Sequence, residues 1–288
     1  MGQQGRYTGV PRAMSQVSAA VQRLLPQHGV SRLVGYLARS QTPWIRNNFI
    51  RTFARTYAVD MSEAARESLA DYHSFNDFFS RALKPGARPL ATDLQTAVCP
   101  ADGMISQAGT IEDGQLLQAK GNSYALTSLV DGPAGEYQGG TFATIYLAPH
   151  NYHRVHVPFD GTLTDTRSIP GALFSVNAQT EASVSNLFAR NERLVCRFTT
   201  LHGPMLVILV GALIVASIET VWSGPVSPFR SAQSQQHEQG FERGAEIGRF
   251  LLGSTVIVCF APGRAVLADG IAAGRGVRMG EALARLND

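Results

Sequence analysis

A glycine–serine pair near the end of the chain has the residue types that self-cleavage of a peptide bond requires. Gly253 and Ser254 directly precede the apolar run of residues 255–258. Attack of the Ser254 hydroxyl on the Gly253 carbonyl would convert the peptide bond into an ester. Elimination and hydrolysis would then leave a pyruvoyl group, an electrophilic carbonyl, at the new N-terminus. Taken alone, a Gly-Ser pair before a strand is more typical of an ordinary turn.

One aspartate and a group of histidines could activate this serine. Asp102 belongs to a turn-like Asp-Gly pair, and His150, His153 and His156 lie within seven residues. A serine hydroxyl becomes a good nucleophile when a base removes its proton. A histidine does this near neutral pH, and a carboxylate can orient the histidine and stabilise its charged form. The sequence therefore contains the groups of an Asp-His-Ser set.

The same histidines could instead bind a metal or be purely structural. Pro149, Pro158 and the valines between the histidines favour an extended chain over a helix. Nearby Cys or Glu residues that would complete a ligand set are missing from this run, so we expect no metal. On a regular strand His153 and His156 would point to opposite faces. Either a bulge brings them together or they have different roles.

Composition and charge limit the class of protein. The 288 residues can bury a full core, and three distant cysteines without a CxxC pair indicate neither a disulfide framework nor a zinc site. The apolar stretch of residues 205–218 is too short to cross a bilayer and predicts a buried strand, or two strands broken near Gly211. Residues 1–59 contain eight arginines and no acidic residue, whereas the whole chain is only +3.

The basic N-terminal region has the pattern of amphipathic helices. Apolar residues recur at helical spacing over 14–25 and 45–57, a short helix is expected around 31–37, and Asp60 to Glu63 resembles a capping box that opens a helix to about residue 70. A further short helix is expected over 74–83. Helices packed on the core with solvated arginines are one interpretation, and binding to an anionic membrane surface is the favoured one. Nucleic acid is not expected, because no stacking or helix-turn-helix motif is present.

Beyond residue 90 the pattern becomes that of a β protein. Strands are expected near 104–110, 115–120, 141–147, 153–157, 161–168, 193–199, 205–221 and 255–260, with Asp-Gly and Gly-Asn turns between them. The polar, Gln- and Ser-rich residues 223–244 are interpreted as a mobile surface loop. We therefore predict an α+β fold with two regions. N-terminal amphipathic helices (1–90) pack on a β-rich catalytic core of mostly antiparallel sheets (91–288).

Several segments together resemble the phosphatidylserine decarboxylases of the bacterial, membrane-associated type. The resemblance covers most of residues 75–260 and rests on segments in the same order: 78–81 (FFSR), 83–89 (LKPGARP), 100–103 (PADG), 120–126 (KGNSYAL), 152–156 (YHRVH), Asn177, 187–193 (LFARNER), 211–212 (GA) and 248–255 (GRFLLGST). One departure is Asn151, where the family more often has Asp.

The resemblance implies a self-cleaving proenzyme. Cleavage between Gly253 and Ser254 would give a β chain of residues 1–253 and an α chain of residues 254–288. Asp102, His156 and Ser254 match the self-cleavage triad. Ser254 would become the covalent pyruvoyl cofactor, whose carbonyl forms a Schiff base with the amine of phosphatidylserine. His153 would return a proton after carbon dioxide leaves, and phosphatidylethanolamine would be released.

The resemblance also implies where the protein acts and with what. It predicts a peripheral protein on the cytoplasmic face of the bacterial cell membrane, able to form a homodimer. Three other functions stay open on the residues alone. A serine hydrolase is disfavoured because Gly-x-Ser-x-Gly is absent around Ser254. A non-catalytic lipid-binding protein is disfavoured by the retained Asp102, His153, His156 and Ser254. A pyruvoyl decarboxylase for a soluble amino acid is disfavoured by the basic N-terminal region.

Overall fold

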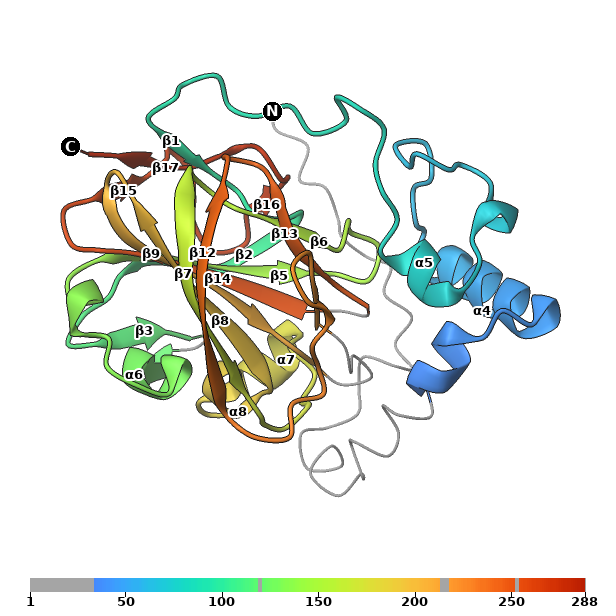
Figure 1. Cartoon of the computed structure of the whole chain (residues 1–288), viewed down its shortest axis with the longest axis horizontal. Helices are drawn as coiled ribbons and strands as arrows, with labels where there is room; N and C mark the ends of the chain where they lie inside the picture. Colours follow the sequence, from blue (N-terminus) through green and yellow to red (C-terminus); the bar gives the residue numbers. More distant parts are fainter. Residues whose placement is uncertain (1–33, 119–120, 213–217, 252–253, 288) are drawn as a thin grey trace, which may run out of the picture.

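The computed structural model has an α+β architecture and describes residues 34–118, 121–212, 218–251 and 254–287. Helices near the N-terminus lie on one side of a core built from antiparallel sheets (Figure 1). The expected fold class is therefore confirmed. The helix expected over 14–25 lies outside the described residues, and the domain boundary at residue 90 stays a prediction.

The helical part is held together by aromatic side chains. Residues 34–39 are helical, and the following elements are α4 (Pro43–Thr56), η1 (Leu69–Asp71) and α5 (Phe75–Phe79). Pro43 starts α4, where its missing N–H costs nothing. The Ser74 hydroxyl caps α5 by accepting a hydrogen bond from the Asp77 N–H at 3.2 Å. Ile50 of α4 and Phe75, Phe78 and Phe79 of α5 are fully buried in one cluster, which joins the two helices.

The predicted helix over residues 60–70 is wrong. Asp60 does accept a hydrogen bond from the Ser62 N–H, but Glu63 does not return to cap the helix start. The Glu63 carboxylate instead binds Arg88 and Arg278, and Ala64 forms an isolated bridge with Leu83. Long-range ion pairs thus replace the local bonds that a capping box needs.

An eight-stranded antiparallel sheet forms the centre of the molecule. Its order is β12-β7-β8-β9-β14-β5-β2-β16. The strands are β2 (Gly103–Thr110), β5 (Thr141–Leu147), β7 (Gly161–Ile169), β8 (Arg193–Thr200), β9 (Gly203–Val210), β12 (Gln233–Phe241), β14 (Ser254–Phe260) and β16 (Gly276–Val277). The strands expected in these regions are confirmed, including the break after residue 210.

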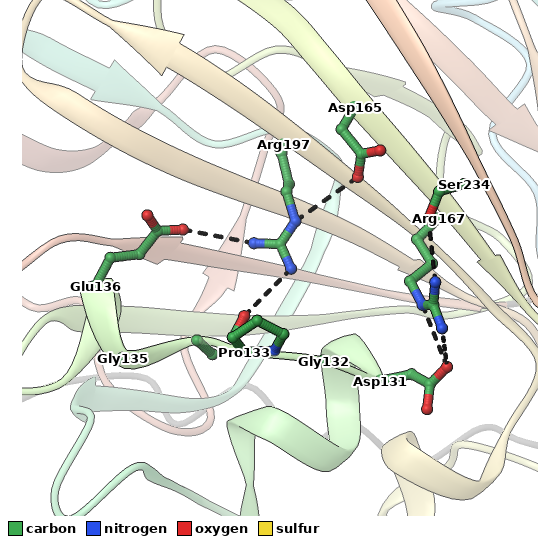
Figure 2. A pocket seen from close by; sticks show the side chains of 10 residues that line it. Asp131, Gly132, Pro133, Gly135, Glu136, Asp165, Arg167, Arg197 and Ser234 are labelled. Carbon is green, nitrogen blue, oxygen red and sulfur yellow. Dashed lines mark hydrogen bonds and ion pairs between the residues drawn. The ribbon is translucent and has the colours of Figure 1, made fainter.

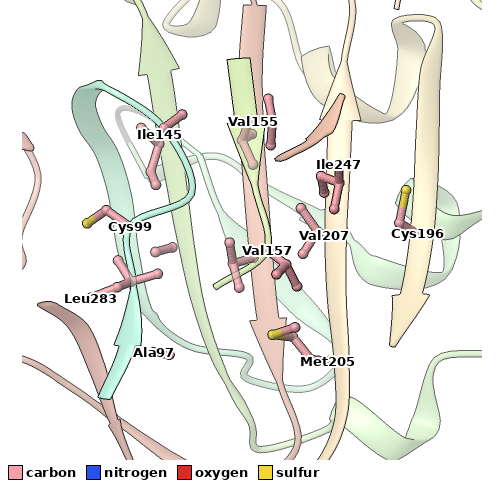
Figure 3. Close-up of a cluster of buried hydrophobic side chains, with 14 of the residues drawn as sticks. Ala97, Cys99, Ile145, Val155, Val157, Cys196, Met205, Val207, Ile247 and Leu283 are labelled. Atoms are coloured by element: carbon pink, nitrogen blue, oxygen red, sulfur yellow. The ribbon is translucent and has the colours of Figure 1, made fainter. Parts of the chain in front are cut away.

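Both faces of this sheet are covered, which explains the uninterrupted apolar runs in its middle strands. Every residue of β14 is buried. Val256 and Val258 belong to one cluster, and Ile257 and Cys259 belong to the cluster on the opposite face. Figure 3 shows part of the first cluster, in which side chains from distant segments meet. The strand that starts at Ser254 is therefore fixed from both sides.

Three smaller sheets complete the β part. One has the order β11-β10-β13-β6, another β1-β17-β15, and β3 pairs with β4. Their strands are β1 (Thr96–Val98), β3 (Gln115–Leu117), β4 (Ser123–Ala125), β6 (Arg154–His156), β10 (Ile218–Thr220), β11 (Gly224–Pro225), β13 (Glu246–Phe250), β15 (Ala265–Leu267) and β17 (Ala282–Leu286). Short helices are α6 (Leu126–Val130), η3 (Gly135–Tyr137), α7 (Ala178–Glu181) and α8 (Leu187–Arg190).

The interpretation of residues 223–244 as a loop is wrong. Residues 233–241 form β12, the edge strand that pairs with β7. Most of its side chains are exposed, so it lacks the apolar alternation by which a half-buried strand is recognised. Backbone pairing with β7, rather than burial, makes this segment a strand.

Two other expectations concern burial and membranes. Cys99, Cys196 and Cys259 are buried free thiols. Burial raises the pKa of the Cys99 thiol to about 12, so this sulfur is an inert packing group. Among the described residues, the helices are all too short or too polar to span a bilayer.

Candidate active site around Ser254

Ser254 is a completely buried residue at the start of the central strand β14. It pairs with Leu147, the last residue of β5. The Ser254 hydroxyl oxygen is buried and has no hydrogen-bond partner among the described residues. A buried hydroxyl without a partner costs about 1–3 kcal/mol, so each such atom requires an explanation, and a chemical role is one of them. A residue whose hydroxyl is consumed in forming a carbonyl fits this position.

The loop that follows β5 carries His153 to the same region. The Asn151 side-chain oxygen accepts a hydrogen bond from the Ala148 N–H at 2.7 Å, which closes the turn. The His153 carbonyl then accepts a hydrogen bond at 2.9 Å from the N–H of Phe250, four residues before Ser254. The imidazole packs against the Phe79 ring, with 4.0 Å between the ring centroids and an angle of 40° between the ring planes. This contact links the helical part to the loop.

The hydrogen bonds of His153 define its tautomer. Its Nδ1 lies 2.9 Å from the Asn151 carbonyl oxygen, which can only accept, so Nδ1 carries the proton. Nε2 of the neutral ring is then an unprotonated acceptor, and it has no partner among the described residues. Burial is the main reason that the pKa of His153 falls to about 3. His153 is therefore neutral at neutral pH, with a bare basic nitrogen.

His156 is also buried, but both of its ring nitrogens are occupied. Nδ1 donates to the Gly244 carbonyl at 2.8 Å, and Nε2 accepts from the Tyr152 hydroxyl at 3.0 Å. Burial lowers the pKa of His156, and the Gly244 hydrogen bond opposes this shift. His156 is thus held in the tautomer whose basic nitrogen is Nε2, and the Tyr152 hydroxyl is hydrogen-bonded to that nitrogen.

Asp102 lies close to His156 in the backbone but binds other groups. The His156 N–H donates to the Pro100 carbonyl at 2.8 Å, which brings the two segments together. The Asp102 carboxylate receives hydrogen bonds from Arg88 Nε at 2.8 Å and Arg88 Nη2 at 2.6 Å. The Met279 N–H donates to it at 2.9 Å. Burial alone would lower the pKa of Arg88, but the hydrogen bonds that it donates to Asp102 and Glu63 outweigh this effect and raise that pKa.

The structure therefore brings only some of the predicted site residues close to one another. His153 lies beside the segment that leads to Ser254, and His156 lies beside the segment that holds Asp102. In the described part of the chain, the Asp102 carboxylate makes no hydrogen bond to His156, whose Nδ1 is held by Gly244 instead. Asp102 acts on His156 only through its charge, which raises the His156 pKa as the smallest of the named causes. Clusters of metal-ligating side chains are not found among the residues that the structure describes.

Sequence reasoning gave no role to Arg88, Tyr152 or Gly244. Arg88 lies in a turn-rich connector, and its partner Asp102 follows 14 residues later, a spacing that no periodicity marks. Gly244 meets His156 across 88 residues. Tyr152, next to His153 in the sequence, and Arg88, within the recognised segment 83–89, carried a usable signal, whereas Gly244 carried none.

Two hollows open on the surface near charged groups. One of about 420 Å³, here named the Arg81 hollow, is lined by Arg81, Arg88, Asp102, His150, Asn151, Tyr152, Arg278 and neighbouring residues. The other, of about 490 Å³, is lined by residues of 131–136 and by Asp165, Arg167, Arg197 and Ser234 (Figure 2). Only the first adjoins the loop that carries His153.

Comparisons with known proteins identify relatives over nearly the whole chain. A family model described as phosphatidylserine decarboxylase matches residues 75–285, and a second, described as PSD, matches residues 17–58. A phosphatidylserine decarboxylase proenzyme of Pseudomonas aeruginosa is 53% identical over 91% of this chain and 94% of its own length. Proenzymes of the same name from Methylococcus capsulatus (52% identical, covering 92% and 95%) and Bordetella pertussis (53% identical, covering 93% and 94%) are equally similar.

Proposed function

The chain belongs to the phosphatidylserine decarboxylase family, an assignment that confirms the resemblance found in its sequence, and we propose that it removes the carboxyl group of phosphatidylserine after cutting itself between Gly253 and Ser254. The observation that carries this proposal is the buried hydroxyl of Ser254 at the start of β14, which has no hydrogen-bond partner among the described residues. A serine hydroxyl in this position is a nucleophile that needs a base to remove its proton.

In self-cleavage the serine loses its hydroxyl proton, and the Gly253 carbonyl carbon exchanges its bond to nitrogen for a bond to the serine oxygen. His156 Nε2 takes the Ser254 hydroxyl proton, and the oxygen attacks the Gly253 carbonyl. The C–N bond breaks as the ester forms, and the freed amine takes up a proton. Loss of the Gly253 carboxylate by β-elimination and hydrolysis of the resulting enamine release ammonia. Because Tyr152 is bound to His156 Nε2, it must either turn away or pass the proton along.

The Asp102–Arg88 pair supports this step from a distance. A buried carboxylate beside a histidine stabilises the charged ring that forms when the base is protonated. Gly244 holds the ring in the required tautomer, the task more often given to the carboxylate itself. Base assistance of this kind is worth about 10²–10⁴-fold in rate.

Ser254 is the residue that would become the covalent pyruvoyl group, which when formed supplies a carbonyl that takes up the electron pair left by carbon dioxide. His153 moves the proton that the reaction requires. Its Nε2, which carries no proton at rest, takes up a proton of solvent origin during the reaction and delivers it to the α-carbon once carbon dioxide has left. Burial lowers the pKa of His153 to about 3, so the protonated ring gives up its proton readily.

The helical part suits attachment to a membrane surface. Trp44 of α4 and Tyr36 are 76% and 73% exposed, and Arg51 and Arg55 of α4 are exposed as well. Aromatic rings sit well at the lipid headgroup boundary, and arginines attract anionic lipids. We place the protein at the cytoplasmic face of the bacterial membrane, with phosphatidylserine as substrate and with the ability to form a homodimer.

Two variants separate cleavage from decarboxylation. Ser254→Ala stays a single chain by denaturing intact-mass spectrometry and is inactive. His153→Ala is cut into residues 1–253 and 254–288 but releases carbon dioxide slowly from phosphatidylserine vesicles. If the wild-type chain stays uncut after incubation with lipid, self-processing is refuted. If His153→Ala is not cut, the roles given to the two histidines are wrong.

A further inference from the structure

Arg81 is a buried cation that forms no ion pair with a carboxylate among the described residues. The residue is only 4% exposed, yet it lines the Arg81 hollow beside α5. Its Nη2 donates to the carbonyl oxygens of His150 at 2.9 Å and Asn151 at 3.4 Å. Its Nε is buried and has no hydrogen-bond partner among the described residues. Burial is the main reason that the pKa of Arg81 falls, which is the mark of a guanidinium whose charge is not matched.

Four acidic residues line the hollow together with Arg81, and three of them bind other groups. Asp102 and Glu63 bind Arg88, and Asp60 binds the Ser62 N–H. Within the described part of the chain, Arg81 forms an ion pair with none of the four, Glu281 included. The arginines of the other hollow differ. Arg167 pairs with Asp131, and Arg197 lies near both Glu136 and Asp165 (Figure 2). A buried charge without a counter-charge is costly, and a bound anion would remove that cost.

The guanidinium also lies close to His153. The Asn151 carbonyl oxygen accepts from Arg81 Nη2 at 3.4 Å and from His153 Nδ1 at 2.9 Å. The two donor nitrogens are therefore separated by no more than the sum of these distances. In a serine phosphodiester, only the ester oxygen and the β-carbon separate phosphorus from the α-carbon. An anion on Arg81 and an α-carbon beside His153 can thus belong to one headgroup.

We infer that Arg81 binds the phosphodiester of the substrate headgroup in the Arg81 hollow, an inference that rests on the proposed function. The substrate carboxylate is the less suitable ligand. An arginine on the carboxylate would stabilise the charge that must disappear when carbon dioxide leaves, and so would slow the reaction. An arginine on the phosphate holds the headgroup without opposing the chemistry. Its planar N–H groups match phosphate oxygens well.

The test uses the self-processed protein and soluble probes. Isothermal titration compares wild type, Arg81→Met and Arg81→Lys, with Arg167→Met as the matched control because Arg167 lines the other hollow and is already paired. The probes are glycerophosphoethanolamine (phosphate without carboxylate), L-serine (carboxylate without phosphate) and inorganic phosphate. Competition against phosphatidylserine turnover is measured for each probe, and intact mass confirms that each variant is cleaved.

The expected result is selective. Arg81→Met weakens the binding of glycerophosphoethanolamine about 10- to 100-fold, as expected for lost charge-assisted hydrogen bonds, and leaves the affinity for L-serine unchanged. Arg81→Lys recovers part of the affinity, and Arg167→Met has no effect. Equal weakening of all probes, or weakening of L-serine alone, overturns the inference. The inference is also overturned if the binding of inorganic phosphate depends on Arg81 but the phosphate does not compete with the substrate. Arg81 would then form a site for free phosphate. Failure of the proposed function would appear separately, as a wild-type protein that binds the probes but does not decarboxylate.

Discussion

Replacement of Arg88 by methionine would test whether the Asp102–Arg88 pair is a buried, essential part of the site. Both side chains are only 7% exposed. The change removes two hydrogen bonds to Asp102, at 2.8 and 2.6 Å, and one to Glu63, at 2.8 Å. The Asp102 carboxylate keeps the Met279 N–H at 2.9 Å. Methionine retains most of the apolar length of the arginine stem, so the charge and its hydrogen bonds are the main loss.

The expected loss of stability depends on the charge that stays buried after the substitution. Breaking a buried ion pair by removing one partner costs about 3–5 kcal/mol, because the other charge is left uncompensated. We expect about 3 kcal/mol for Arg88→Met, at the lower end, since one hydrogen bond to Asp102 survives. Asp102→Asn should cost about 2 kcal/mol, because Arg88 keeps Glu63. The double variant should lose about 2 kcal/mol less stability than the two single variants added together, since neither the Asp102 nor the Arg88 charge is then left without the other.

Urea unfolding followed by circular dichroism measures these values. All variants are made in the Ser254→Ala background, so that every protein stays one chain. Arg66→Met is the control, because Arg66 and Asp77 form a similar pair whose side chains are 39% and 29% exposed. Such exposed pairs contribute about 0–1 kcal/mol. An Arg88→Met protein no less stable than the Arg66→Met control, or strictly additive single variants, would refute the reasoning.

Three further predictions concern the protonation, backbone packing and surface of the same protein. Burial holds the pKa of His153 near 3 in the folded state against about 6.5 unfolded, so its contribution to stability is present above pH 6.5 and lost as the pH falls toward 3. His153→Gln should therefore flatten the pH dependence of the urea midpoint in that window, where this histidine contributes up to about 1.4 kcal/mol per pH unit; parallel profiles would contradict the assignment. A methyl group on Gly103 would lie 2.3 Å from the Tyr146 carbonyl oxygen, whereas one on Gly276 meets no atom within 4 Å. Gly103→Ala should lose about 2 kcal/mol and Gly276→Ala almost nothing, and equal midpoints would show that β2 can shift. Replacing Trp44, Arg51 and Arg55 of α4 by serine and glutamines should weaken sedimentation with anionic vesicles, and more so at low salt; unchanged sedimentation would argue against a membrane role for α4.

Local sequence information was sufficient for the elements whose burial is periodic. The apolar run after Ser254 predicted β14, and the break at residue 211 was visible in the composition of 205–218. Amphipathic spacing predicted α4. These elements bury a regular set of side chains, and that regularity is a local property. The order of recognisable segments also identified the family.

The elements and contacts that depend on distant partners were not predictable in this way. β12 is polar and exposed, and only its pairing with β7 makes it a strand. Glu63 does not cap a helix as expected, because its carboxylate forms ion pairs with Arg88 and Arg278 from distant parts of the chain.

The same division holds for the site. The sequence by itself determined which groups are available: Asp102, His153, His156 and Ser254. The tertiary structure alone decided which nitrogen of each histidine carries the proton, because the carbonyls of Asn151 and Gly244 fix the tautomers. It also decided that Asp102 binds Arg88 and that the buried Arg81 Nε has no hydrogen-bond partner in the part of the chain that the structure describes. Hydrogen bonds and burial depend on which segments meet in space, and sequence spacing does not encode those meetings.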